Sequence, residues 1–215
     1  MPLVALIGLV LFGVLAFGLR AWIHYRRTGT TGFVGLTGAV GSLEWLAGVM
    51  FAAALALAVA APLADLAGWT HRLPWDGPAA HAAGIVLFAC GLAGTLWAQL
   101  AMGDSWRIGV DASARTDLVD GGPFRWVRNP IFTAMTFALL GLLLLVPTVL
   151  SLAAVAALVL ALELQVRWVE EPYLEATHGR RYREYAARTG RFLPGIGRWE
   201  QGGRPGQRTA QEKTT

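Results

Sequence analysis

The sequence predicts an all-α protein: a polytopic membrane helix bundle of about five transmembrane helices, with a hairpin of the fourth and fifth helices and a helical C-terminal segment in the cytoplasm. Hydrophobic residues make up 55% of the chain and charged residues only 15%, whereas a soluble domain has about 45–50% and 25%. The apolar residues also gather in blocks near the roughly 20 residues that a helix needs to cross a bilayer. Both observations favour a single membrane bundle.

Three apolar blocks predict the first three membrane helices, at residues 3–23, 43–66 and 80–102. The first block contains one charged residue, Arg20, which lies close enough to its end to reach the membrane interface. No basic residue precedes this block, and it is longer than the roughly 7–15 apolar residues of a signal peptide. We therefore interpret it as a membrane helix and not as a cleaved leader.

The apolar stretch 131–166 predicts the fourth and fifth helices. It is too long for one crossing at ~1.5 Å per residue, and Pro147 lies near its midpoint. A kinked single helix is the alternative, but a proline at this place favours a tight turn between two helices. Pro130 suits the first turn of the fourth helix, and Asn129 then stands as a natural N-cap.

The arginines predict the orientation of the bundle. A short hairpin brings the 103–130 loop and the chain from residue 167 onward to the same side, and both are rich in arginine. Basic loops mark the cytoplasmic side, and Arg26 and Arg27 in the 24–42 connection agree with this. The N-terminus is then outside and the second half is cytoplasmic. Abundant Ala, Gly and Arg suggest a bacterium of high GC content, and therefore the bacterial inner membrane.

The chain divides into three segments. Residues 1–102 hold the first three membrane helices, and residues 103–199 form the module that carries the polar chemistry. This module is expected to end in a helical stretch from residue 167 to about residue 188, which Gly179 interrupts. Residues 200–215 are rich in Gly, Gln, Arg and Thr, a composition that predicts a disordered tail.

Other chemistries find little support in the sequence. The histidines His24, His71, His81 and His178 are scattered without the spacing of a metal site, so no metal is expected. No basic stretch alternates with aromatic residues as a groove for single-stranded nucleic acid requires, so no nucleic-acid partner is expected. Cys90 is the only cysteine, and within its apolar block we interpret it as a small hydrophobic side chain.

Two polar clusters stand out in the second half. The 103–130 loop is longer than the about 12–15 residues of an ordinary connection, and it ends in a Gly-Gly-Pro turn followed by arginines. The second cluster is Glu163, Arg167, Glu170 and Glu171, of which the first three share a helical face. Head-group contacts and intrahelical ion pairs explain these clusters without a ligand. They also suit a ligand that bears a cation and a carboxylate, as S-adenosylmethionine does.

The order of motifs resembles the isoprenylcysteine carboxyl methyltransferase family, which is related to the phospholipid methyltransferases. The motifs are Gly-Pro-Phe-Arg-x-x-Arg-Asn-Pro-x-Phe at 122–132, Arg-x-x-Glu-Glu-Pro-x-Leu at 167–174 and Gly-x-x-Tyr-x-x-Tyr at 179–185. Ser-Trp-Arg-Ile-Gly-Val at 105–110 and Arg-Phe-Leu-Pro at 191–194 fit as well. Each motif is short, but their order around a membrane hairpin is specific.

The resemblance implies an integral membrane methyltransferase that uses S-adenosylmethionine and takes a lipophilic acceptor from the surrounding membrane lipids. We expect in-line methyl transfer to a carboxylate, which is already ionised and needs no base. Arg128 and Arg167 are the implied catalytic residues, because they would orient this anionic acceptor. The cofactor-binding residues that the resemblance and the glycine turn imply are Gly122, Pro123, Arg128, Asn129, Pro130, Phe132, Glu170, Glu171, Tyr182, Tyr185 and Arg191.

Two positions depart from the family pattern, and alternatives stay open. Asn129 stands where the family usually has histidine, and Phe132 where it has tyrosine, so base chemistry loses support and O-, N- and S-methylation all remain. A membrane NADPH-dependent sterol or enone reductase is one alternative, which the pair Glu170 and Glu171 disfavours. A family member without activity is another. A transporter fits less well, because the polar clusters lie at helix ends and not at the midplane.

Overall fold

The computed structural model describes residues 1–33, 35, 38–106 and 117–200, and across these residues the regular structure is helical. Two isolated bridges join Arg72 with Thr148 and Val127 with Gly190. The predicted all-α membrane bundle is therefore confirmed. The expected disorder of residues 201–215, and most of the motif at 105–110, fall on residues outside this description.

The predicted membrane helices correspond to observed ones. The first comprises α1 (Pro2–Phe12), the π-helical η1 (Gly13–Leu19) and α2 (Arg20–Thr28). Next come α3 (Leu43–Leu66), α4 (Pro78–Met102) and the hairpin of α5 (Pro130–Leu145) and α6 (Val149–Leu164). Among the described residues, four helical stretches are long and apolar enough to cross a membrane: Pro2–Thr28, Leu43–Leu66, Pro78–Ser105 and Val149–His178. The fifth predicted helix, α5, is apolar but shorter.

A tight turn at residues 146–148 joins α5 to α6, so the hairpin is confirmed and a kinked single helix is excluded. The hydroxyl of Thr148 accepts a hydrogen bond from the backbone N–H of Ser151 and so caps α6. The Ser151 hydroxyl donates in turn to the carbonyl of Val146, at 2.6 Å. These polar groups satisfy backbone atoms that the proline turn leaves without helical partners.

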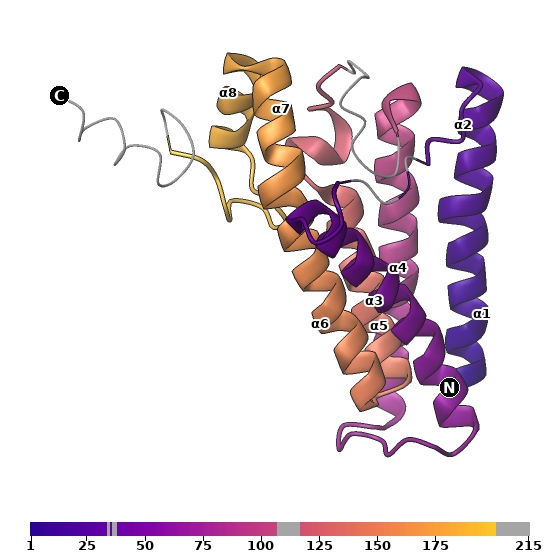
Figure 1. Cartoon of the computed structure of the whole chain (residues 1–215). Coiled ribbons are helices and arrows are strands. Elements are labelled where there is room, and N and C mark those ends of the chain that lie inside the picture. The colour runs from indigo at the N-terminus through magenta and orange to yellow at the C-terminus, as the bar shows by residue number, and fades with distance from the viewer. Residues whose placement is uncertain (34, 36–37, 107–116, 201–215) are drawn as a thin grey trace.

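The two helices of this hairpin pack less against each other than against helices from earlier in the chain. α5 lies along α4, and α6 lies along α3. Glycines allow the first contact: a Cβ on Gly141 would lie 2.5 Å from the backbone nitrogen of Phe88, and a Cβ on Gly91 would collide with the backbone nitrogen of Ala138. Figure 1 shows the resulting bundle, with α3 crossing it and α1 at its edge.

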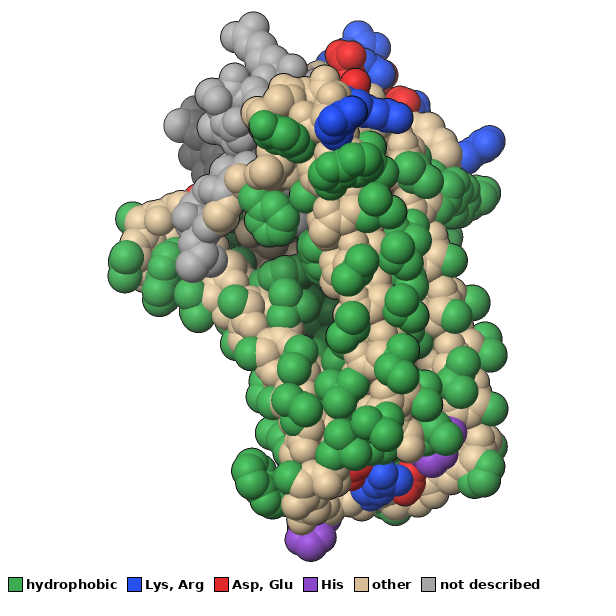
Figure 2. Space-filling view, turned by 90° about the vertical axis from the view of Figure 1, so that its right-hand side faces the viewer, with side chains coloured by type: hydrophobic (Ala, Val, Ile, Leu, Met, Phe, Trp, Pro, Cys, Tyr) green, Lys and Arg blue, Asp and Glu red, His purple; other side chains and the backbone are tan. Residues whose placement is uncertain are grey.

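The polar segments gather at the two ends of the bundle. Figure 2 shows hydrophobic side chains over its middle and charged side chains toward each end. One end carries the 67–77 connection and the hairpin turn, and here Arg72 pairs with Asp65 at 2.6 Å and Asp76 at 2.9 Å. The other end carries the C-terminal helices (Figure 1). This distribution is that of an integral membrane protein.

The chain after α6 continues as one helical rod into the polar end. The π-helical η4 (Gln165–Glu170) leads directly into α7 (Glu171–His178). Gly179, with φ of 53°, ends this rod, and α8 (Arg180–Arg188) follows. A positive φ is strained for any residue with a Cβ, which explains why the predicted helical stretch divides at this glycine. Two short 3-10 helices, η2 (Gly103–Ser105) and η3 (Gly122–Arg125), belong to the connection before α5.

Candidate functional site

A cavity of about 520 Å³ opens at the polar end of the bundle, within the range of small-molecule sites. Its wall combines α3, α5, α6, η4, α7 and α8 with parts of η1 and α4. Of the residues that the sequence implied, those in this wall are Arg128, Asn129, Pro130, Phe132, Glu170, Glu171, Tyr182 and Tyr185. Those not among the lining residues are Gly122, Pro123, Arg167 and Arg191.

Gly122 and Pro123 shape the wall without facing the cavity. Gly122 has a φ of 56° and begins η3, and Pro123, the second residue of this short helix, is buried. The turn places Phe124 against the cavity, where its carbonyl accepts a hydrogen bond of 2.7 Å from the Tyr185 hydroxyl. The glycine turn therefore positions an aromatic wall residue.

Arg128 holds the C-terminal segment in place. Its Nη1 donates to the carbonyls of Ala186, at 3.1 Å, and of Thr189. Its Nη2 donates to the carbonyl of Gly197, at 3.0 Å, and to a carboxylate oxygen of Glu171, at 2.6 Å. A guanidinium has five N–H groups, and Nε is buried here without a partner. Bidentate binding of an acceptor carboxylate would therefore require Arg128 to give up existing bonds.

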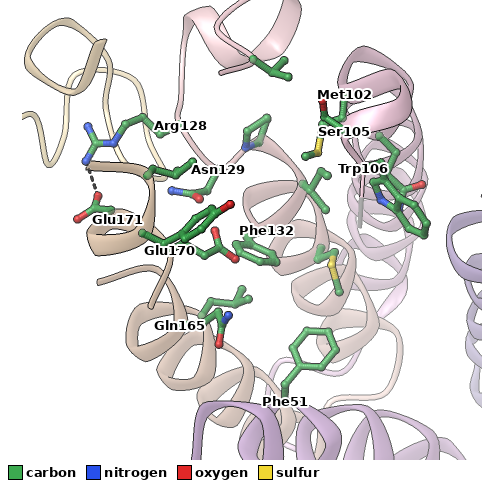
Figure 3. A pocket seen from close by; sticks show the side chains of 18 of the residues that line it. Phe51, Met102, Ser105, Trp106, Arg128, Asn129, Phe132, Gln165, Glu170 and Glu171 are labelled. Carbon is green, nitrogen blue, oxygen red and sulfur yellow. Dashed lines mark hydrogen bonds and ion pairs between the residues drawn. The ribbon is translucent and has the colours of Figure 1, made fainter. Parts of the chain in front are cut away.

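Glu171 is the centre of a buried ion-pair network. It is 3% exposed and receives two hydrogen bonds from Arg191, from Nε at 2.8 Å and from Nη2 at 2.9 Å, besides the bond from Arg128. Two arginines therefore surround one carboxylate, which is the arrangement a buried charge needs. Glu171 and Arg191 fasten the C-terminal segment to α7, and Figure 3 shows Glu171 turned toward Arg128.

Glu170 and Arg167 lie in contrasting surroundings. In Figure 3 Glu170 points into the cavity beside Phe132, and no cation pairs with it among the residues that the structure describes. Arg167 points to the exposed side of the rod, where its side chain is 52% accessible and forms an ion pair with Glu163. Glu170 is thus the cavity carboxylate of this helix, while the Glu163–Arg167 pair fits the intrahelical interpretation.

Asn129 connects the start of α5 to the C-terminal segment. It occupies the N-cap position as predicted, but its side chain makes no capping bond. Its amide nitrogen instead donates to the carbonyl of Arg191, at 3.1 Å. Thr133, one turn later, donates similarly to the carbonyl of Phe192, at 2.7 Å. The Asn129 side chain therefore binds a carbonyl far along the chain and not a backbone N–H of its own helix.

Tyr182 and Tyr185 form the aromatic base of the polar end, together with Leu118 and Trp199. Burial raises the pKa of both tyrosines above the ordinary value of this side chain, and the negative charge of Glu171 raises that of Tyr182 further. Both hydroxyls therefore stay protonated near neutral pH. Both rings serve as packing groups, and the Tyr185 hydroxyl also donates a hydrogen bond to the Phe124 carbonyl. We expect neither hydroxyl to act as a base.

Several lining residues were not anticipated from the sequence. Glu44 and Phe51 of α3, Trp106 after α4, and Gln165 of η4 all face the cavity (Figure 3 labels the last three). For α3 a signal existed: Glu44 is followed at helical spacing by the small residues Ala47, Gly48 and Ala52. Such a stripe leaves space beside a helix, but it resembles an ordinary packing face.

Arg20 corrects an expectation about the first helix. Its side chain does not extend to the interface but is buried, with its guanidinium 4.7 Å from the ring centre of Trp106. It donates to the carbonyl of Gly103, at 2.5 Å, just after the C-terminus of α4. A cation is favourable at a helix C-terminus, so Arg20 pairs with α4 and supports a wall residue of the cavity.

Comparison with known families supports the motif analysis. Residues 79–181 match the family model described as phospholipid methyltransferase, a segment that runs from α4 into α8. No curated protein matches the chain significantly. The matched segment supplies Arg128, Asn129, Glu170 and Glu171, and it leaves α1 to α3 outside. Over residues 79–181 the chain is therefore similar to the phospholipid methyltransferase family, a family of membrane methyltransferases.

Proposed function

We propose that this protein is a membrane methyltransferase that uses S-adenosylmethionine and acts on a lipophilic acceptor at the cytoplasmic end of the bundle. The observation that carries the proposal is the carboxylate of Glu170, which lies in the cavity wall, accepts a hydrogen bond from Gln165 and has no ion pair among the described residues. A buried carboxylate without a cation favours a ligand that brings a positive charge.

The residues of the cavity fit the proposed cofactor in three respects. Glu170 would pair with a cationic group, and the unpartnered Nε–H of Arg128 would donate to a carboxylate. Phe132 and Trp106 offer aromatic surfaces to a planar base. When bound, S-adenosylmethionine supplies a methyl group on a positively charged sulfur. An acceptor's lone pair would form the new bond to this methyl carbon, while the carbon–sulfur bond would break and leave its electron pair on sulfur.

The protein's contribution is positioning and exclusion of water. Arg128, Glu171 and Arg191 fix the C-terminal segment that closes one side of the cavity. The engagement of Arg128, and the outward position of Arg167, weaken the interpretation of a carboxylate acceptor held by these two arginines. We therefore propose a positioning role for Arg128 and no contact between Arg167 and the acceptor.

Calorimetric titration of the detergent-purified protein with S-adenosylhomocysteine tests this proposal. The wild type is expected to bind, and Glu170→Gln to bind about tenfold more weakly, because the lost ionic hydrogen bond is worth about 1.5–3 kcal/mol. Glu163→Gln is the matched control on the same rod, since Glu163 does not line the cavity. Equal loss in both variants, or a folded wild type stabilised by NADPH and not by S-adenosylhomocysteine, would overturn the proposal.

A further inference from the structure

One face of α3 lines the cavity over about three helical turns. Its residues are Glu44, Ala47, Gly48, Phe51, Ala52 and Leu55, and their spacings of three and four residues place them on the same side of a helix. At ~1.5 Å per residue this face is about 16 Å long. It lies outside the segment that matches the family model.

The chemistry of this α3 face changes along its length. Glu44, in the first turn of α3, is its one charged residue, and the residues after it are small or apolar. No ion pair or hydrogen bond engages the Glu44 side chain among the residues that the structure describes. Ala52 and Leu55 are exposed at the far end, where Leu55 is 40% accessible. The face thus has a carboxylate at one end and an open apolar end.

The walls that α5 and α6 contribute beside the α3 face are apolar and aromatic. Phe132 and Met135 of α5, with Ala161 and Leu162 of α6, line the same cavity. In Figure 3 Phe51 rises from α3 toward the space beside Phe132. A channel with such walls accepts a hydrocarbon chain, because it offers the chain an apolar environment like that of the surrounding lipid.

We propose that the α3 face is the acceptor subsite, and that Glu44 selects a single-chain amphiphile whose head group is an amine. The carboxylate accepts N–H hydrogen bonds from such a head group and repels a carboxylate head group. It would also take up the proton that an ammonium head group must lose before its lone pair can accept a methyl group. The hydrocarbon chain lies along Gly48, Phe51 and Leu55. Glu44 is thus a specificity-determining residue. This subsite rests on the proposed function for its role in methyl transfer, but its binding preference is measurable without turnover.

Photolabelling in detergent micelles tests the subsite. Two probes are used: a long-chain amine with a terminal diazirine, and the fatty acid of the same length with the same diazirine. The amine is expected to label the peptide that contains Phe51 and Leu55 about tenfold more than the acid does, as one ionic hydrogen bond allows. Glu44→Gln is expected to remove this preference, and Glu163→Gln to retain it.

A second variant separates the chain subsite from the head-group subsite. Ala52→Phe narrows the channel at an exposed position, so we expect it to lower labelling by both probes. Binding of S-adenosylhomocysteine is measured in each variant and is expected to stay within about twofold of wild type. Equal labelling by amine and acid in the wild type, or an unchanged preference in Glu44→Gln, overturns the inference. Absence of S-adenosylhomocysteine binding contradicts the proposed function and leaves the labelling result to decide the subsite.

Discussion

At the scale of single residues, neighbouring carboxylates have different surroundings and therefore different roles. Glu171 is enclosed by Arg128 and Arg191, whereas Glu170 faces the cavity without a cation among the described residues. The one-residue step between them turns the two side chains by about 100° around the helix. We therefore expect replacement of Glu171 to act through loss of stability and replacement of Glu170 to act through loss of ligand binding. Stability measurements separate these two causes.

We predict that Glu171→Gln strongly destabilises the fold. Removing one partner of a buried ion pair leaves uncompensated charge and costs about 3–5 kcal/mol, and Glu171 is 3% exposed. The free energy of unfolding, measured by titration with a denaturing detergent, should fall by this amount. Glu163→Gln should change it by less than about 1 kcal/mol, as exposed pairs do. Similar stabilities for the two variants would contradict the buried network.

The tyrosines predict an alkaline limit to stability. Burial raises the pKa of Tyr182 and Tyr185 in the folded protein above the ordinary value of about 10. The folded state therefore holds these protons more tightly than the unfolded state does. Their contribution is complete below a pH of about 10 and is lost as the pH rises through the folded-state pKa values.

Ultraviolet absorbance during alkaline titration measures this effect. The absorbance change due to Tyr182 or Tyr185 is the part that is lost in Tyr182→Phe or Tyr185→Phe. This part should appear at higher pH in the folded protein than in the denatured protein. Ionisation of both tyrosines at the pH of the denatured chain would show that these side chains are accessible to water. Tyr185→Phe should also loosen η3, because it removes the bond to the Phe124 carbonyl.

At the scale of helices, glycines determine which partners approach each other closely. Gly91 and Gly141 bring the backbones of α4 and α5 into direct contact. Small residues matter in membranes because the hydrophobic effect does not favour contact between helices over contact with lipid, so close packing decides which helices associate. We predict that Gly91→Ala costs about 1–3 kcal/mol by overpacking, because its Cβ would collide with the backbone of Ala138.

Gly13→Ala is the matched control for this substitution. A Cβ at Gly13 meets nothing within 4 Å, and alanine is the better helix former by about 1 kcal/mol. The unfolding free energy measured by denaturing detergent should therefore fall in Gly91→Ala and stay constant or rise in Gly13→Ala. Unchanged stability of Gly91→Ala would contradict the close approach of α4 and α5.

The sequence predicts the helices well and their partners poorly, for a physical reason. An apolar block of bilayer length, or Pro147 at the middle of a long one, specifies local structure through hydropathy and backbone geometry alone. Partner choice depends on shape across the bundle, so the pairing of α5 with α4 was not foreseen. The same holds for the site. A sequence motif predicts Glu170, whereas the position of Glu44 in the cavity and the bond from Asn129 to Arg191 are seen only in the assembled fold.

At the scale of the whole molecule, the two ends of the bundle differ in their charged groups, and the cavity lies at one of them. The cavity and the arginine-rich C-terminal helices occupy one end, and the Arg72 network occupies the other (Figure 1). Because basic segments stay in the cytoplasm, we propose that the cavity end is cytoplasmic. A cytoplasmic cavity would draw S-adenosylmethionine from the compartment that makes it.

Cysteine labelling tests this orientation. In a Cys90→Ala background, a cysteine at His71 is expected to react with a membrane-impermeant maleimide added to intact cells. A cysteine at Arg180 should react only after the membrane is opened, because α8 would lie inside. Both positions are exposed on the protein surface. A difference in maleimide labelling between them would therefore reflect the membrane barrier and not burial within the protein. The reverse pattern would place the cavity on the outer side.

The divided packing of the hairpin has a consequence for biosynthesis. α5 and α6 are joined by a three-residue turn, yet each lies mainly along a helix made earlier, α4 or α3. When only the first four membrane helices have been synthesised, α3 lacks its principal neighbour, α6. The cavity then also lacks Ala161, Leu162 and Glu170. Assembly of the bundle must therefore wait for the last membrane helix, and a chain interrupted before it presents an incomplete bundle to membrane quality-control proteases.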